Sequence, residues 1–182
     1  MELYLLCLMA GESRRMGSLK QFVSLGGRTF FEYIVQRVSA VRDHCSRWVF
    51  VGRAGDERGR EAVAMVGGVW VINPSPEDGP LSSIRCALSE IPESSGILLW
   101  PIDHPLVSDS SLQALLSTAT ANPDAIVVPS FHHKRGHPVI FPAWARAFLQ
   151  SAPLEEGARW VLRQNPQRLI HVSVDDPWVC QN

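Results

Sequence analysis

The apolar run Leu3–Leu8, LYLLCL, leads directly into the stretch Met9–Lys20, MAGESRRMGSLK. The run has no charged side chain, which predicts a strand buried on both faces of a sheet. The stretch places glycines beside Arg14, Arg15 and Lys20, although the formal net charge of the chain is only −1. Glycines let backbone N–H groups approach anionic oxygens closely, and arginine and lysine add fixed positive charge. This favours a phosphate-binding loop after the first strand; the alternative is a solvated basic turn.

The spacing of this loop excludes two common phosphate motifs. A P-loop needs a lysine directly after its second glycine, followed by serine or threonine. Here Lys20 comes three residues after Gly17, and Gln21 follows it. The dinucleotide fingerprint G-x-G-x-x-G is also absent.

Beyond this stretch, short apolar runs alternate with helical patterns along the chain. The alternation predicts an α/β fold, a Rossmann-like three-layer sandwich in which helices cover both faces of a mostly parallel, twisted sheet. Thr29 and either Ser108 or Asp109 are the expected N-caps of two helices. The strand candidates are residues 2–8, 47–52, 69–73, 96–103, 124–130, 138–142 and 168–174, and the helix candidates are 29–41, 56–66, 81–91, 108–119, 142–150 and 155–165.

In such a sheet, ligands bind beyond the carboxyl ends of the strands. The segments that follow those ends are residues 10–20, 73–80, 103–107 and 129–138. We therefore expect these four loops to come together around one site.

Composition narrows the class of protein. A length of 182 residues predicts one domain, residues 1–182. With 17 basic and 18 acidic residues, the chain has no net positive field that would attract nucleic acid. The four cysteines are scattered, which predicts a reduced protein without structural zinc. No apolar stretch approaches the roughly 20 residues that span a bilayer, and the first apolar run precedes its positive charges, unlike a signal peptide. We expect a cytoplasmic protein without a membrane partner.

Six segments carry a resemblance to a known family. The first, LMAGESRRMGSLKQF, resembles the L-A-A-G-x-S-x-R-M-G-x-x-K signature of MobA-like nucleotidyltransferases, and within them the molybdenum cofactor cytidylyltransferases. The others resemble segments of that subgroup in the same order. They are NPSPEDGPLSSIRCAL (residues 73–88), PIDHPLVS (101–108), KRGHPVIFP (134–142), EGARWVLRQNP (156–166) and VSVDDPWV (172–179).

The resemblance implies transfer of a nucleotidyl group: an acceptor phosphate attacks the α-phosphorus of a nucleoside triphosphate, and pyrophosphate leaves. Such chemistry needs positioning and charge neutralisation. The resemblance assigns it to Arg15, Lys20 and Asp103, with Asp103 holding Mg²⁺. Taken alone, Lys20 could be a surface lysine and Asp103 a turn residue. The nucleotide-binding residues that the resemblance implies are Leu8, Ala10, Gly11, Glu12, Ser13, Arg14, Arg15, Met16, Gly17, Lys20, Asn73, Gly79, Ser82 and Ser83.

The identity of the base stays open between CTP and GTP. Within the family, MAG (residues 9–11) and the pair Ser82 and Ser83 favour cytosine. DGPL (residues 78–81) instead resembles guanine-selecting relatives. The serine pair also suits a helix N-terminus, and both readings can hold together.

The acceptor that the resemblance implies is a molybdopterin-type phosphate, bound by Lys134, Arg135 and His137. The two cations suit a phosphate, and His137 either orients it or is a structural loop residue. Three histidines in FHHKRGHP raise the question of zinc, but the glycine and the proline disfavour a helical H-x-x-x-H pair and no cysteine or carboxylate is nearby.

The C-terminal region departs from the family pattern. The family continues through D-I-D-T-P-E-D, in which an aspartate helps to complete the metal site, whereas this chain ends VDDPWVCQN and is short relative to the family. Either part of the metal shell is lost, or Asp175 or Asp176 substitutes. A homodimer partner would then cover the open edge of the sheet.

Three functions therefore remain in view. The first is a nucleotidyltransferase that acts on molybdopterin, with a molybdoenzyme as a candidate client. The second is a catalytically degenerate nucleotide-binding or cofactor-chaperoning protein. The third is a nucleotidyltransferase for a sugar phosphate or polyol phosphate.

Overall fold

The structure, a computed structural model, describes residues 2–11 and 19–181. Its strands are β1 (Leu3–Leu8), β2 (Ser24–Leu25), β3 (Arg28–Thr29), β4 (Cys45–Arg53), β5 (Val69–Asn73), β6 (Gly96–Pro101), β7 (Ile126–Phe131), β8 (Lys134–Arg135), β9 (Val139–Phe141) and β10 (Leu169–Ser173). Its α-helices are α1 (Phe30–Ser39), α2 (Glu57–Met65), α3 (Pro80–Ala87), α4 (Asp109–Ala121), α5 (Ala145–Ser151) and α6 (Arg159–Gln164). Short 3₁₀ turns include η1 (Lys20–Phe22), η3 (Pro76–Asp78), η5 (Leu154–Glu156) and η7 (Pro177–Val179).

The first apolar run forms an interior strand of the main sheet, between β4 and β6. The sheet has the order β5-β4-β1-β6-β9-β7-β10, with β8 paired to β7, and β1 is parallel to both β4 and β6. Successive side chains of β1 point to opposite faces, so Leu5 and Cys7 enter one core and Leu6 the other. All three are fully buried, which explains why the run is apolar throughout.

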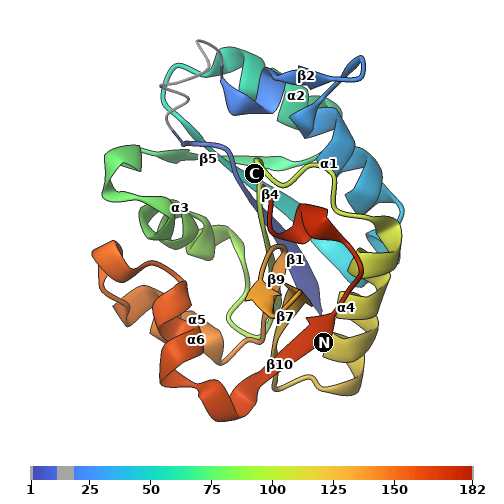
Figure 1. Ribbon diagram of the computed structural model, residues 1–182. Helices are drawn as coiled ribbons and strands as arrows, with labels where there is room; N and C mark the ends of the chain where they lie inside the picture. Colours follow the sequence, from blue (N-terminus) through green and yellow to red (C-terminus); the bar gives the residue numbers. More distant parts are fainter. Residues whose placement is uncertain (1, 12–18, 182) are drawn as a thin grey trace.

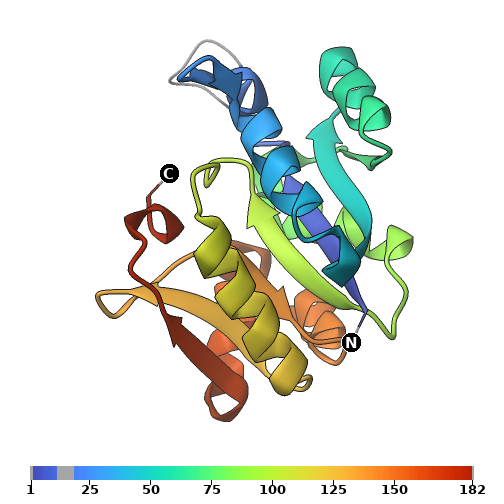
Figure 2. The same cartoon turned by 90° about the vertical axis from the view of Figure 1, so that its right-hand side faces the viewer.

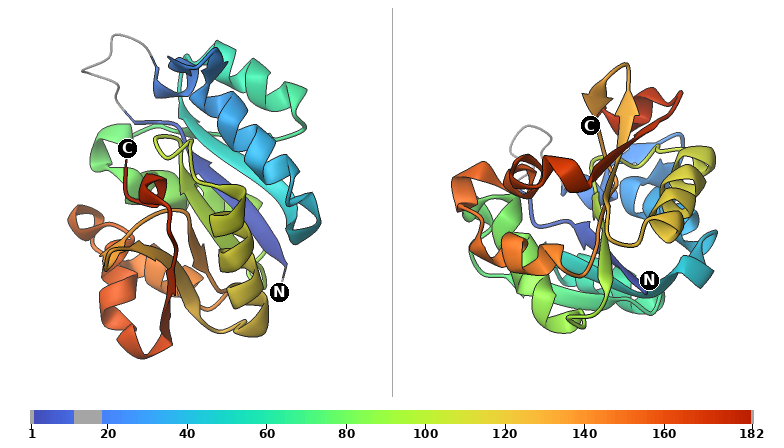
Figure 3. Two further views of the ribbon diagram at one scale, coloured as in Figure 1. Left: turned by 45° about the vertical axis from the view of Figure 1, so that its right-hand side comes forward. Right: turned by 90° about the horizontal axis from the view of Figure 1, so that it is seen from below.

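Helices cover both faces of this sheet. Figure 1 shows α3, α5 and α6 on one side and α1 and α4 on the other, and the view from below in Figure 3 shows the sheet between the two layers. Buried side chains of α1, α2 and α4 belong to one core, and those of α3, α5 and α6 to the other. The predicted three-layer α/β fold with a mostly parallel sheet is confirmed.

Two helix starts follow the expected capping chemistry. Thr29 Oγ1 accepts a hydrogen bond from the Glu32 N–H, and the Glu32 carboxylate accepts one from the Thr29 N–H, which is a complete capping box. Ser108 Oγ accepts from the Ser111 N–H at the start of α4. These bonds set where α1 and α4 begin.

One part of the sheet differs from the parallel pattern. The chain reverses after β7 through His132 and His133, both with positive φ (47° and 64°), and β8 returns antiparallel to β7. The next strand, β9, continues in that direction between β6 and β7 and is antiparallel to both. The tight turn is the physical reason, because it leaves no room for the crossover helix that a parallel strand needs.

Among the described residues, none of the helices has the length and apolar character required to cross a lipid bilayer.

Candidate active site

A cleft of about 700 Å³ lies beyond the carboxyl ends of the central strands. All four predicted loops contribute to its lining: Gly11 and Lys20 come from the first, Gly79 from the second, Asp103 from the third and His137 from the fourth. The expectation that these loops meet is therefore confirmed. They connect different strands and helices, and only the sheet topology brings them together.

The cleft lining contains an ion pair between residues far apart in the sequence. Lys20 Nζ donates to Asp103 Oδ2 at 2.9 Å, and both side chains are partly buried. Burial raises the pKa of Asp103, but the hydrogen bond and the positive charge of Lys20 outweigh it, so the pKa lies below its usual value. Asp103 is therefore an anion at neutral pH, held directly beside a cation.

Hydrogen bonds hold both ends of the first loop (residues 10–20) to neighbouring elements. They involve residues for which the sequence predicted no role. Arg53, the last residue of β4, donates from its guanidinium to the carbonyl oxygens of Ala10 (3.3 Å) and Gly11 (2.8 Å). At the other end, the Gln21 side-chain amide donates to the Asp56 carboxylate, which caps α2. No motif marks these contacts, because they depend on strand order.

The buried side-chain amide of Asn73 fixes the conformation of the second loop (residues 73–80). Asn73 donates to Ser82 Oγ (2.8 Å) and Ser83 Oγ (2.9 Å), and its side-chain oxygen accepts from the Ser75 N–H. Asn73 is only 1% exposed. Asn73 positions the loop and does not line the cleft. Ser82 does not line the cleft either, because its hydroxyl is directed to the carbonyl oxygens of Ser75 and Gly79.

The predicted nucleotide-binding residues therefore fall into three groups. Five line the cleft: Leu8, Gly11, Lys20, Gly79 and Ser83. Three others, Ala10, Asn73 and Ser82, lie behind that lining. The remaining predictions, Glu12, Ser13, Arg14, Arg15, Met16 and Gly17, lie outside the described residues.

Two of the three predicted acceptor residues line the same cleft. These are Arg135 and His137, whereas Lys134 is exposed and does not belong to the lining. The His137 ring lies against His104, with the ring centroids 4.9 Å apart. His104 Nε2 is 3.8 Å from Asp103 Oδ1, so the two imidazoles extend from the ion pair towards the loop of residues 134–138. His104 has no predicted role, although it lies inside the PIDHPLVS segment.

We expect the buried imidazole of His137 to make stability depend on pH. Burial, followed by the charge of His104, lowers its pKa from 6.5 to about 4. Between these values the unfolded chain binds a proton that the folded protein excludes, so the free energy of unfolding falls as the pH falls from 6.5 to 4, by at most about 3 kcal/mol. Urea unfolding at a series of pH values measures this slope.

The matched control is His44→Asn, because His44 is exposed and no aromatic contact holds its ring among the described residues. In His137→Asn the pH slope should shrink, while His44→Asn should retain it. An unchanged slope in His137→Asn would contradict the assignment.

A fifth segment completes the cleft and was not among the predicted loops. Residues 154–159, which run from the turn after α5 into the first residue of α6, line the cleft together with Leu162. Val139 and Phe141 of β9 add an apolar wall. The lining therefore combines charged groups with an apolar wall.

The donor set of the cleft suits a magnesium ion that arrives with its substrate. Mg²⁺ in nucleotide sites commonly takes one or two carboxylates and completes its shell with phosphate and water. Asp103 supplies one such carboxylate. Within residues 2–11 and 19–181 there is no cluster of three or more His, Cys, Asp or Glu side chains arranged to hold a metal by themselves.

Neither C-terminal aspartate lies with Asp103 in the cleft. Asp175 lines a separate hollow of about 550 Å³ with His132, His133 and His171. Both carboxylate oxygens of Asp176 already accept hydrogen bonds from protein groups. The geometry therefore gives no support to either aspartate as a substitute metal ligand.

Comparison with known proteins agrees with this description. No curated protein sequence matches the chain significantly. Among solved structures, Rv0371c from Mycobacterium tuberculosis H37Rv has a TM-score of 0.80 at 22% identity, covering 94% of this chain and 87% of that one. Molybdopterin-guanine dinucleotide biosynthesis protein A from Archaeoglobus fulgidus has a TM-score of 0.67 at 19% identity, covering 96% and 84%. The 4-diphosphocytidyl-2C-methyl-D-erythritol synthase from Anaerococcus prevotii DSM 20548 has a TM-score of 0.78 at 14% identity, covering 99% and 89%.

These structural similarities establish the fold. The family is established by a match to the sequence itself. The family model described as MobA-like NTP transferase domain matches residues 5–169, which is most of the chain. The predicted family is thus confirmed: this chain belongs to the MobA-like NTP transferase domain family.

Proposed function

We propose that this chain is a Mg²⁺-dependent cytoplasmic nucleotidyltransferase, a single domain of residues 1–182. It transfers CMP, with GMP as the second choice, from the nucleoside triphosphate to a molybdopterin-type phosphate and releases pyrophosphate. The observation that carries the proposal is the Lys20–Asp103 pair at the point where four loops meet. Family membership supports nucleotidyl transfer in general.

The two charged groups suit the two demands of this reaction. Lys20 offers an ammonium group that can neutralise charge on the α-phosphoryl and on the leaving pyrophosphate. Asp103 offers a carboxylate that can hold Mg²⁺, which supplies further charge neutralisation for the triphosphate when bound. In the described protein the two groups neutralise each other at 2.9 Å, so a nucleotide and its metal ion would exchange this contact for two new ones.

Other residues of the cleft lining suit the acceptor. Arg135 presents a guanidinium, which can bind a phosphate through two hydrogen bonds. Val139, Phe141 and Leu162 provide an apolar wall for the body of the molecule. A flat acceptor that carries a phosphate matches both features, and the name of the Archaeoglobus relative favours molybdopterin.

The test is pyrophosphate release by the purified protein with CTP or GTP, Mg²⁺ and molybdopterin. We expect release only when nucleotide, metal and acceptor are all present, and faster release with CTP. Release with 2-C-methylerythritol 4-phosphate in place of molybdopterin would support the polyol-phosphate alternative. Nucleotide binding without release with any of these acceptors would support the degenerate binding protein.

A further inference from the structure

We propose that residues 176–180, the C-terminal turn, form a brace that positions two loops of the cleft relative to each other. One is the Asp103 loop (residues 102–108), and the other is the His137 loop (residues 134–138). The proposal rests on the proposed function and deepens it, because it assigns positioning roles to residues that do not line the cleft. Figure 2 shows the C-terminal turn beside the loop that leads into α4.

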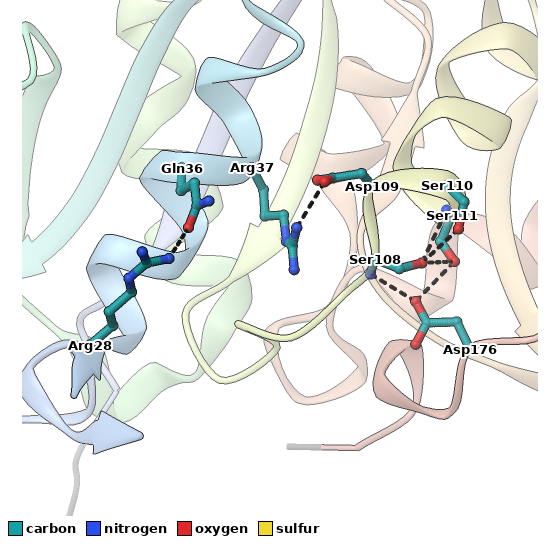
Figure 4. Close-up of polar contacts among 8 residues, drawn as sticks. All are labelled: Arg28, Gln36, Arg37, Ser108, Asp109, Ser110, Ser111 and Asp176. Carbon is teal, nitrogen blue, oxygen red and sulfur yellow. Dashed lines mark hydrogen bonds and ion pairs between the residues drawn. The ribbon is translucent and has the colours of Figure 1, made fainter. Parts of the chain in front are cut away.

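The first anchor of the brace is Asp176. One of its carboxylate oxygens accepts hydrogen bonds from the Ser108 N–H and the Ser111 hydroxyl, both at 2.9 Å (Figure 4). The other oxygen accepts from the Trp178 N–H at 3.0 Å. The side chain is 5% exposed. A buried carboxylate with three donors is held in one position, so the turn is fixed to the end of the Asp103 loop.

The second anchor is the backbone of Val179. Its carbonyl oxygen accepts from the His137 N–H at 2.8 Å, and its side chain is fully buried in the core shared with α4. Gly136 makes this approach possible, since a Cβ at that position would lie 2.1 Å from the same carbonyl oxygen. The thiol of Cys180 adds a weak contact to the Lys134 carbonyl at 3.4 Å.

A third contact joins the two loops through the turn. His104 Nδ1 lies 3.4 Å from the Trp178 carbonyl oxygen, within reach of a ring N–H donor. On its other side, the His104 ring packs against His137. The ring of His104, the residue after Asp103, and the backbone N–H of His137 thus contact consecutive carbonyl groups of one short turn, those of Trp178 and Val179.

This arrangement matters because the two loops carry different partners of the proposed reaction. Asp103 and Arg135 both line the cleft, and our proposal assigns Asp103 to the nucleotide with its metal ion and Arg135 to the acceptor. In a reaction between two bound molecules, a shift of about 1 Å between them can cost about 10²-fold in rate. Asp176 and Val179 are therefore positioning residues: they should affect the transfer step and leave nucleotide binding intact.

The test compares three variants of the full chain. Asp176→Ala removes the first anchor, and Gly136→Ala pushes the Val179 carbonyl away and removes the second. Asp175→Ala is the matched control, because Asp175 is exposed, adjacent in sequence and does not line the cleft. For each protein we would measure pyrophosphate release with saturating CTP, Mg²⁺ and molybdopterin, CTP affinity by calorimetry, and backbone hydrogen exchange.

We expect Asp176→Ala and Gly136→Ala each to lower the rate of release about 10- to 100-fold, with CTP affinity close to that of the wild type. If both act through one brace, the double variant should lose little more than either single variant. Exchange at the His137 amide should rise in both variants and not in Asp175→Ala. Rescue by Asp176→Asn should be partial, because an amide can accept from Trp178 but its nitrogen cannot accept from Ser108.

Two results would overturn the brace. One is unchanged exchange at His137 in Asp176→Ala and Gly136→Ala. The other is a loss of CTP affinity as large as the loss of rate, which would indicate general disruption of the fold. If the wild type itself released no pyrophosphate, the proposed function would fail, and the exchange data alone would decide whether the turn holds the His137 loop.

Discussion

Asp103→Asn is expected to lower the rate of pyrophosphate release by about 10²- to 10³-fold, a loss of about 3–4 kcal/mol of transition-state stabilisation. The substitution keeps the size of the side chain but removes the charge that the proposed metal site needs. In the absence of metal, the variant should retain the affinity of the wild type for CTP, because the substitution removes a negative charge that would repel the triphosphate. The measurement is the rate at saturating CTP over a range of Mg²⁺ concentrations.

The matched control for this variant is Asp124→Asn. Asp124 is exposed near the far end of α4, and its side chain forms no hydrogen bond or ion pair among the described groups. It should release pyrophosphate at the wild-type rate. An Asp103→Asn variant that kept the wild-type rate and the wild-type dependence on Mg²⁺ would contradict the role given to Asp103.

Lys20→Ala is expected to weaken CTP binding about tenfold and to lower the rate of release about 10²-fold. The ammonium group is partly buried, so its interaction with phosphate oxygens is screened less than that of a surface lysine. The variant should also raise the pKa of Asp103, because burial then acts without the opposing Lys20 contact. The acid limb of the pH–rate profile should accordingly move to higher pH.

Two comparisons make the Lys20 result specific. Arg60→Ala removes an equal charge from an exposed position on α2, where Arg60 pairs with Glu57, and should leave both affinity and rate unchanged. Lys20→Arg retains the charge and should recover part of the affinity. Equal losses in Lys20→Ala and Arg60→Ala would show that only the net charge of the protein matters.

Local sequence patterns were sufficient to locate most strands of the main sheet and the α-helices that cover it. The run at β1 is apolar on both faces because it is an interior strand covered on both sides, and the capping chemistry of Thr29 and Ser108 marked where α1 and α4 begin. The position of the cleft followed from a rule of topology, since loops at the carboxyl ends of parallel strands share one edge. Lys20 and Asp103 were therefore identifiable before their contact was known.

Contacts between distant segments could not be predicted in this way. Arg53 approaches Gly11 only because β4 lies beside β1, and Asp176 reaches Ser108 across 68 positions of sequence. The antiparallel insertion of β9 depends on the reversal after β7, which has histidines where glycine or asparagine would usually signal such a turn. Asn73 has the residue type of a ligand-binding group, and only its burial shows that it positions the second loop.

The most direct test of the central claim is titration calorimetry of the wild-type chain with CTP and with GTP, each with and without Mg²⁺. We predict binding of one nucleotide in preference to the other, strengthened by Mg²⁺, because we propose that the paired Lys20 and Asp103 bind a metal–triphosphate complex. The absence of binding by both nucleotides at millimolar concentration, with Mg²⁺ present, would contradict the account.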